Sequence, residues 1–146
     1  MKVEVEIDPS CQELRLMIIT QTMNDEVQQL LTRIQKPEVE LLSGFHDSGV
    51  RLIQQDEIIR IYTEDNKVVT STKKGEYTLR LRLYECESKL DPKRFVRISN
   101  SEIINLKEVS NFDLQYSGTI HVKMKNGEST FVSRRYVSKI KKVLGI

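Results

Sequence analysis

The sequence predicts a mainly β (α+β) protein in which about ten short, mostly antiparallel strands are closed by a C-terminal helix. Runs rich in valine, isoleucine and tyrosine follow residue 38, and glycine, asparagine and aspartate turns separate them. The Asn126-Gly127 pair is a strong hairpin signal between two such runs. The last residues instead repeat apolar side chains at helical spacing. Strands this numerous and this short favour a sheet protein with hairpin connections.

Residues 1–38 are predicted to form a separate β-β-α extension. Apolar and charged residues alternate across 1–8, with the period of a half-buried strand, and a second strand is expected at 14–19. A capping box that begins at Thr22 predicts a helix ending near Gln35, and Pro37 closes the unit. We expect this extension to pack on the core or to act as a dimerisation element.

Residues 39–146 are predicted to form one domain of strands and two helices. A helix at 83–90 would turn Cys86 inward, which makes this cysteine a core residue rather than a nucleophile, and Pro92 would stop that helix. A C-terminal helix would begin after Ser133. The strands are expected at 39–45, 50–53, 58–63, 68–69, 77–81, 95–99, 102–105, 109–115, 119–124 and 129–132.

Length and composition exclude several classes of protein. The 146 residues suit a single domain with a small appended element, and the formal net charge is +2. Cys11 and Cys86 form no CxxC pair, and no secretory leader opens the sequence, so a secreted disulfide framework is not expected. No apolar run approaches the roughly 20 residues that span a bilayer. We expect a cytoplasmic protein without direct membrane insertion.

The distribution of charge is more informative than its total. Residues 1–40 carry four basic and eight acidic side chains, whereas the residues from Ser117 onward carry seven basic side chains and one acidic, Glu128. A basic C-terminal face would steer an anionic polymer to one side of the molecule. A solvated lysine-rich helix would explain the same composition, so charge alone leaves both interpretations open.

Two adjacent arginines stand where the C-terminal helix should begin. With Ser133 as the N-cap, Arg134 and Arg135 would lie in the first turn, where the helix already presents partial positive charge. Each cation there costs a few tenths to about 1 kcal/mol, and a docked anion would remove that cost. Lys139, Lys141 and Lys142 are ordinary residues for a solvated helix face.

No catalytic or cofactor-binding pattern is found in the sequence. His46 and His121 have no cysteine or carboxylate neighbours at metal-ligand spacing, and the phosphate-binding, dinucleotide-binding and serine-nucleophile motifs are missing. We therefore predict a protein that is not an enzyme and needs no cofactor or metal.

The segment FVRISNSEIIN, which begins at Phe95, carries polar side chains between β-type apolar residues. Asn100 can be a turn residue between two strands, or its amide can read adenine in a major groove. The same two interpretations apply to Ser99, Ser101 and Asn105. Arg97 can equally project from an exposed strand face.

Three segments together resemble the LytTR family of bacterial DNA-binding domains. They are DEIIRIYTEDNKVVTSTKKGEYTLRLRLYE at 56–85, RFVRISNSEIINLKEV at 94–109 and GTIHVKMKNGESTFVSRRYVSKIKKVLGI at 118–146. The F-x-R-x-x-x-S-x-I-x-N and V-S-R-R-Y blocks occur at family spacing with the Asn-Gly hairpin between them. The resemblance implies a ten-stranded fold that inserts loops, not a recognition helix, into successive major grooves of bent double-stranded DNA.

The resemblance also implies which residues contact DNA. Base contacts would come from Lys67, Asn100 and Arg135, although the turn before Val68 varies in length and Asn66 could take the place of Lys67. The expected contacts to the DNA backbone come from Asn66, Arg97, Ser99, Ser101, Arg134 and Lys139.

The N-terminal extension departs from the commonest family layout. Many relatives carry a phosphoreceiver domain there, but about 40 residues without paired acids cannot form one, so phosphorelay input is not expected. The resemblance implies a transcriptional regulator that binds paired DNA repeats as a homodimer. The alternative is a protein-interaction module that couples to a membrane-associated sensor, with weak or no DNA binding. RNA binding ranks last, because no exposed aromatic platform is expected.

Overall fold

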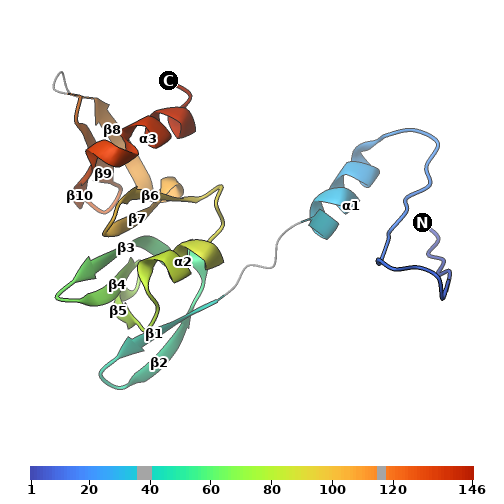
Figure 1. Cartoon of the computed structure of the whole chain (residues 1–146), viewed down its shortest axis with the longest axis horizontal. Helices are drawn as coiled ribbons and strands as arrows, with labels where there is room; N and C mark the ends of the chain where they lie inside the picture. The colour runs from blue at the N-terminus through green and yellow to red at the C-terminus, as the bar shows by residue number, and fades with distance from the viewer. Residues whose placement is uncertain (36–40, 115–117) are drawn as a thin grey trace. The chain divides into compact units, whose positions relative to one another are not determined.

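A computed structural model describes residues 1–35, 41–114 and 118–146 of the chain. The chain divides into two compact units, Met1–Pro37 and Glu38–Ile146, which are described separately (Figure 1).

The first unit contains one helix, α1 (Asp25–Gln35), and its residues 1–24 form no strand. The prediction of strands at 1–8 and 14–19 is therefore wrong. A strand needs a neighbouring strand to bond its backbone, and none of the described residues pairs with either segment. The predicted capping box at Thr22 is also wrong, because the Asn24 side chain accepts the Val27 N–H at 3.0 Å and caps the helix.

The second unit contains ten antiparallel strands, as the sequence predicts (Figure 1). Seven strands form one sheet in the order β2-β1-β5-β4-β3-β7-β6, and three form a second sheet in the order β10-β9-β8. The first sheet consists of β1 (Leu42–His46), β2 (Gly49–Ile53), β3 (Ile58–Glu64), β4 (Lys67–Thr72), β5 (Gly75–Leu79), β6 (Phe95–Ser99) and β7 (Glu102–Asn105). The second consists of β8 (Val109–Leu114), β9 (Ile120–Met124) and β10 (Ser129–Val132).

These strands lie within a few residues of the predicted ranges. β4 is longer than its prediction, because Thr70, Ser71 and Thr72 pair with β5 and are buried although they are polar. Residues 39–40 and 115, which the sequence also assigns to strands, lie outside the described part of the chain.

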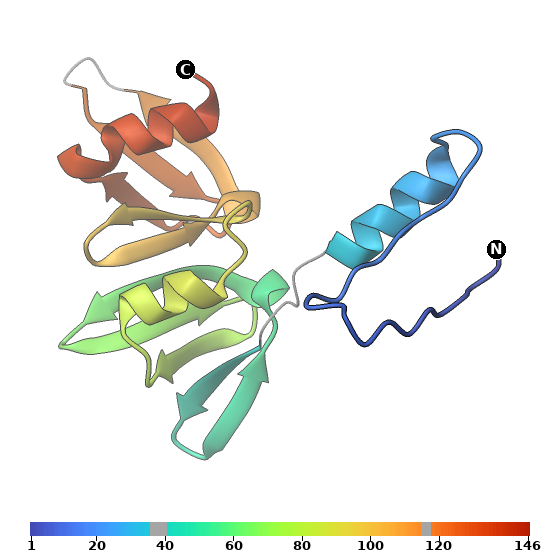
Figure 2. The same cartoon turned by 45° about the vertical axis from the view of Figure 1, so that its right-hand side comes forward.

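Short helices complete the second unit. α2 (Leu83–Lys89) lies against the seven-stranded sheet, and α3 (Val137–Leu144) lies across the three-stranded sheet (Figure 2). Three single turns of 3₁₀ helix are η1 (Gln55–Glu57), η2 (Leu106–Glu108) and η3 (Arg134–Tyr136). Gly145, at a φ of 75°, ends α3 in the left-handed conformation that favours glycine. Among the described helices, none is long and apolar enough to span a membrane.

Alternation along β6 and β7 builds two hydrophobic cores on opposite faces of one sheet. Phe95 and Ile103 pack with residues of α2 and the other large-sheet strands. Val96, Ile98 and Ile104 pack instead with the three-stranded sheet and Ile140 of α3, which is fully buried. Period-2 alternation therefore lets one hairpin join the two layers.

Cys86 is a core residue, as predicted. Its side chain is fully buried in the core beneath α2. Burial raises the pKa of its thiol to about 11, which keeps the sulfur protonated at neutral pH. Such a thiol is a poor nucleophile.

Candidate nucleic-acid interface

The tip of the β6–β7 hairpin presents Asn100 to solvent. Asn100 and Ser101 connect the two strands, and both are exposed. The Ser101 N–H donates to Ser99 Oγ at 3.2 Å, and the two serine hydroxyls lie 3.2 Å apart. The turn is therefore ordered by its own serines, and Asn100 remains exposed.

Arg97 holds this turn from the inside. Its Nε donates to the Ser99 carbonyl at 2.8 Å, its Nη2 donates to the Asn100 carbonyl at 2.6 Å, and its Nη1 donates to Glu87 Oε2 at 2.9 Å. Only 13% of the Arg97 side chain is exposed. The guanidinium is therefore committed to internal partners, which suits a residue that positions Asn100 better than one that binds phosphate.

The two arginines at the start of the last helix lie in η3, one turn before α3. Ser133 precedes them as the N-cap of η3 in an extended conformation, as predicted, although its side chain makes no capping hydrogen bond. Its N–H instead donates to the Ile98 carbonyl at 2.9 Å and ties η3 to the end of β6. Arg134 and Arg135 are exposed, and within the described residues neither guanidinium has a hydrogen-bond or ion-pair partner. Both are free to meet an anion.

Tyr136 joins η3 to the β6–β7 turn. Its hydroxyl donates to Asn100 Oδ1 at 3.1 Å, and its half-buried ring packs against the second core. In the sequence, Tyr136 is one of the apolar residues that repeat at helical spacing near the end of the chain. The signal for its additional role is the hydroxyl itself, because a half-buried tyrosine usually finds a partner for its O–H.

The third element is the β3–β4 turn. Asp65 and Asn66 form its tip with φ angles of 51° and 63°, and both are exposed. Lys67 is the first residue of β4, paired with Glu64, and its side chain is exposed. The sequence predicts Lys67 at the tip of the turn, so the structure shifts the tip by one residue toward Asn66.

Backbone and side-chain bonds connect the three elements. The Thr63 N–H, near the end of β3, donates to the Ser101 carbonyl at 2.9 Å. Tyr136 and Ser133 bind the opposite side of the same hairpin, as described above. The structure therefore brings the β3–β4 turn, the β6–β7 turn and η3 together as one surface, although they are far apart in sequence.

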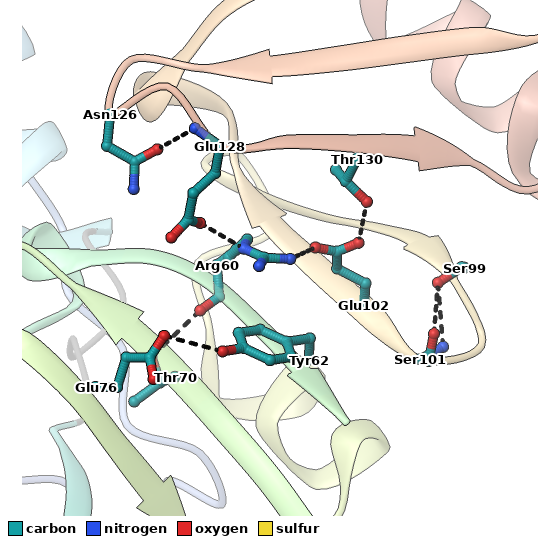
Figure 3. Close-up of polar contacts among 10 residues, drawn as sticks. All are labelled: Arg60, Tyr62, Thr70, Glu76, Ser99, Ser101, Glu102, Asn126, Glu128 and Thr130. Atoms are coloured by element: carbon teal, nitrogen blue, oxygen red, sulfur yellow. Dashed lines mark hydrogen bonds and ion pairs between the residues drawn. The ribbon is translucent and has the colours of Figure 1, made fainter. Parts of the chain in front are cut away.

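A cluster of polar side chains around Arg60 lies behind this surface (Figure 3). The Arg60 guanidinium donates to Glu102 at 2.5 Å and to Glu128 at 2.6 Å, and Thr130 donates to the second oxygen of Glu102. Its guanidinium also lies 4.2 Å from the centre of the Tyr62 ring. Burial by itself would lower the pKa of Arg60, but the two carboxylate bonds outweigh it and raise the pKa above its usual value. This Arg60 cluster joins the large sheet to the β9–β10 hairpin.

Lys139 is the last of the predicted contact residues. It lies on α3, half of its side chain is exposed, and its Nζ is 3.9 Å from Glu87 Oε1. The long separation leaves the ammonium available to solvent anions.

The described part of the chain offers little support for a metal site or for a catalytic histidine. No group of three or more histidine, cysteine or carboxylate side chains gathers there as a metal site would require. His46 Nδ1 contacts the Ser48 hydroxyl at 2.9 Å, and His121 stacks edge-on against Phe131 at 3.7 Å between ring centres. Asn105, which the sequence left open as a contact, is buried and bonds the Ile58 carbonyl.

Comparisons with known proteins agree with the fold. Residues 48–145 match the family model described as the LytTr DNA-binding domain. The chain is 32% identical to an uncharacterized HTH-type transcriptional regulator of Staphylococcus aureus (strain NCTC 8325), over 100% of this chain and 99% of that protein. A regulator of the same description from strain MRSA252 is 31% identical with the same coverage.

A solved LytTr DNA-binding domain from Bacillus cereus has the same fold, with a TM-score of 0.70. It is 24% identical in sequence and the match covers 73% of this chain and 97% of that domain. The family model spans well over half of the chain, and the relatives match along its whole length. The chain therefore belongs to the LytTR family of DNA-binding domains.

Proposed function

We propose that the chain is a sequence-specific transcriptional regulator that binds double-stranded DNA through the three-element surface and has no enzymatic activity. The observation that carries this proposal is the bonding of the β3–β4 turn, the β6–β7 turn and η3 into one surface with exposed polar tips. The names of the Staphylococcus aureus relatives support the regulatory role. Their names also refer to a helix-turn-helix, but the described helices α2 and α3 are separated by five strands. We therefore assign DNA reading to turns that enter successive major grooves.

Asn100 and Arg135 supply the chemistry of base recognition. A carboxamide that donates and accepts can bond adenine N7 and N6 together, and an arginine fork can bond guanine O6 and N7. Tyr136 occupies one lone pair of Asn100 Oδ1, which fixes the orientation of the amide and leaves its NH₂ group and second lone pair for the base. Lys67, beside the Asn66 tip, supplies the third contact.

Other exposed polar groups suit the phosphate backbone. Arg134, Ser99, Ser101 and Lys139 flank the base-reading tips, and Asn66 extends the surface on the β3–β4 side. Phosphate contacts of this kind fix the register of the protein on the duplex but carry no sequence information. We assign Arg97 a positioning role, because its three N–H groups already hold the Asn100 turn and Glu87.

Substitution of the two base-reading residues tests the proposal. A cognate duplex would first be selected from a random pool, which also reveals the spacing of any repeats. Asn100→Ala and Arg135→Ala should each cost about 1–3 kcal/mol on that duplex and much less on random DNA. Lys141→Ala, which removes an exposed cation of α3, should weaken binding to both duplexes equally.

Equal losses on cognate and random DNA for Arg135→Ala would overturn its base-reading role. Failure of the random pool to yield any enriched duplex would overturn sequence-specific binding itself. Tyr136→Phe tests the orientation of Asn100 separately, since it keeps the ring in the core and removes only the hydroxyl that orients the Asn100 amide.

The alternative is a protein-interaction module that couples to a membrane-associated sensor. The apolar side chains of the first unit favour some protein contact, because Val3, Val5 and Ile7 are each more than three-quarters exposed. We assign this contact to a second copy of the chain, which would let a homodimer bind paired repeats in the cytoplasm. A salt titration separates the two functions, since binding through several phosphates makes log K fall steeply with log salt.

A further inference from the structure

A small cavity lies where α2, β6 and α3 meet. Its volume is about 150 Å³, and Leu90, Phe95, Ile103 and Val143 contribute apolar walls. The cavity forms here because β6 is the edge strand of the large sheet, so helices that cover the two faces approach each other beyond it. With the exception of Arg97 and Lys139, its lining residues are absent from the proposed DNA surface.

Three charged side chains line the same cavity. Glu87 of α2 accepts a bond from Arg97 Nη1 at 2.9 Å, and its other oxygen lies 3.9 Å from Lys139 Nζ. Two cations therefore share one carboxylate, which leaves the group with a net charge of +1. Because Lys139 approaches only to 3.9 Å, its ammonium has capacity for a second anionic partner.

The size and the charge together define a ligand class. A cavity of about 150 Å³ is the size that accommodates one benzene ring, so the apolar walls can hold a body of that size. We propose that this cavity binds a small carboxylic acid with an apolar body, such as a benzoate-sized acid, with its carboxylate on Arg97 and Lys139. Glu87 is 42% exposed and can turn toward solvent when the ligand carboxylate takes its position.

Arg97 connects this cavity to the Asn100 turn. The guanidinium that faces the cavity through Nη1 also holds the Ser99 and Asn100 carbonyls through Nε and Nη2. A ligand carboxylate would draw the guanidinium toward the cavity and loosen those two bonds. Occupancy of the cavity by the ligand would then lower the preference of the protein for cognate over random DNA. This coupling rests on the proposed function.

Binding to the cavity can be tested without DNA. The full chain, labelled with ¹⁵N, would be titrated with benzoate, with benzamide as a neutral ring of the same shape, and with acetate as a carboxylate without the ring. We expect saturable amide shifts at Glu87, Arg97 and Lys139 with benzoate, and Kd values at least about tenfold weaker for the other two probes. Equal binding of benzamide would overturn the carboxylate assignment.

Substitutions locate the site. Val143→Trp should abolish the benzoate shifts by filling the cavity, and its half-exposed position on α3 allows the larger ring without disturbing the core. Lys139→Gln should weaken benzoate binding at least about fivefold, while the matched control Lys142→Gln on the same helix should not. Shifts that persist in Val143→Trp, or that never saturate, would overturn the site.

A final measurement tests the coupling. Saturating benzoate should lower the affinity for cognate DNA by about fivefold or more and the affinity for random DNA much less, and cognate DNA should weaken benzoate binding by the same factor as benzoate weakens cognate DNA binding. Saturable binding in the cavity with an unchanged ratio would overturn the regulatory role but leave the site. If the chain selects no DNA sequence, the proposed function fails, whereas the benzoate titration of the free protein remains a valid test of the cavity.

Discussion

Asp65 and Asn66 are two adjacent residues without glycine that both adopt positive φ angles. A two-residue type I′ turn requires this pair of angles, because its twist matches that of the flanking strands. Asparagine and aspartate tolerate the conformation better than other side-chain-bearing residues, and glycine adopts it at the lowest steric cost. The side chains of this turn therefore offer contacts to a partner that a glycine turn could not make.

The β3–β4 turn allows two contacts to be separated. Asn66→Gly should change the free energy of unfolding by less than about 1 kcal/mol, because relief of left-handed strain opposes the greater chain entropy of glycine. It should weaken cognate and random DNA binding alike, as expected of a backbone contact. Lys67→Ala should lose affinity mainly on cognate DNA. Titrations of both variants on cognate and random duplexes measure the affinities, and thermal unfolding measures the stability. A loss confined to cognate DNA for Asn66→Gly, with a uniform loss for Lys67→Ala, would assign the base contact to Asn66.

At the residue scale, the sequence predicts the exposed polar residues of the tips but not the side chains that hold these tips in place. Asn100, Arg134 and Arg135 are exposed on the predicted segments. The burial of Arg97 could not be predicted, since its ion-pair partner Glu87 lies ten residues earlier on a different element. The shift of the turn tip from Lys67 to Asn66 depends on backbone angles that residue types only suggest.

At the element scale, the Arg60 cluster is the polar connection between the two sheets. Glu102 is only 6% exposed, and its two oxygens are bonded by Arg60 and Thr130. Removal of one member of a buried pair leaves the other charge without compensation, which costs far more than the pair contributes relative to apolar residues. The cluster is therefore sensitive to truncation.

Truncation of Arg60 should destabilise the second unit. Arg60→Ala should lower the free energy of unfolding by about 3–5 kcal/mol, because it leaves the Glu102 carboxylate buried and unpaired. The free energy of unfolding of Arg60→Lys should lie between those of Arg60→Ala and the wild type, since an ammonium cannot reproduce both guanidinium bonds and the contact with the Tyr62 ring. Urea unfolding would measure both. A loss for Arg60→Ala no larger than that for the exposed Lys141→Ala would contradict the role of the cluster.

The ten described strands of the second unit could be predicted because short runs of β-branched and aromatic residues are separated by turn signals. Apolar and charged residues also alternate across 1–8, but the strand predicted there is not formed. None of the described residues provides a neighbouring strand to bond its backbone. Pattern indicates which face of a strand would be apolar, but pairing depends on a partner elsewhere in the chain or in another molecule. The sequence also could not identify the cap of α1, because Thr22 and Asn24 are both good capping residues and only geometry distinguishes them.

On the scale of the whole molecule, the two units differ in charge and in exposed surface. The acidic N-terminal residues carry large apolar side chains in water, including Leu14 at 98% exposure and Ile19 at 89%. The second unit instead buries two clusters of apolar residues and carries an excess of basic side chains near the C-terminus. These properties suit a first unit that contacts protein and a second unit that contacts DNA.

A charged substitution in the first unit should test the proposed dimer. The wild-type chain at micromolar concentration is expected to sediment as a dimer, and Val5→Glu should shift it to a monomer by placing a charge on the apolar side of residues 1–8. The variant should keep its affinity for a single DNA repeat and lose affinity for paired repeats. Glu6→Gln, on the other side of the same segment, is the matched control. A monomeric wild type without DNA would contradict a preformed dimer.

The strands that meet at Arg60 lead to each of the three elements that we propose to read DNA. β3 continues from Arg60 to the Asp65–Asn66 tip, β7 begins at Glu102 directly after the Asn100 turn, and β10 follows Glu128 and runs into η3. The half-buried Arg60 guanidinium therefore links strands that lead to all three tips. If the tips read bases as proposed, we expect them to select the bases of an operator and the core to fix how many base pairs separate those bases.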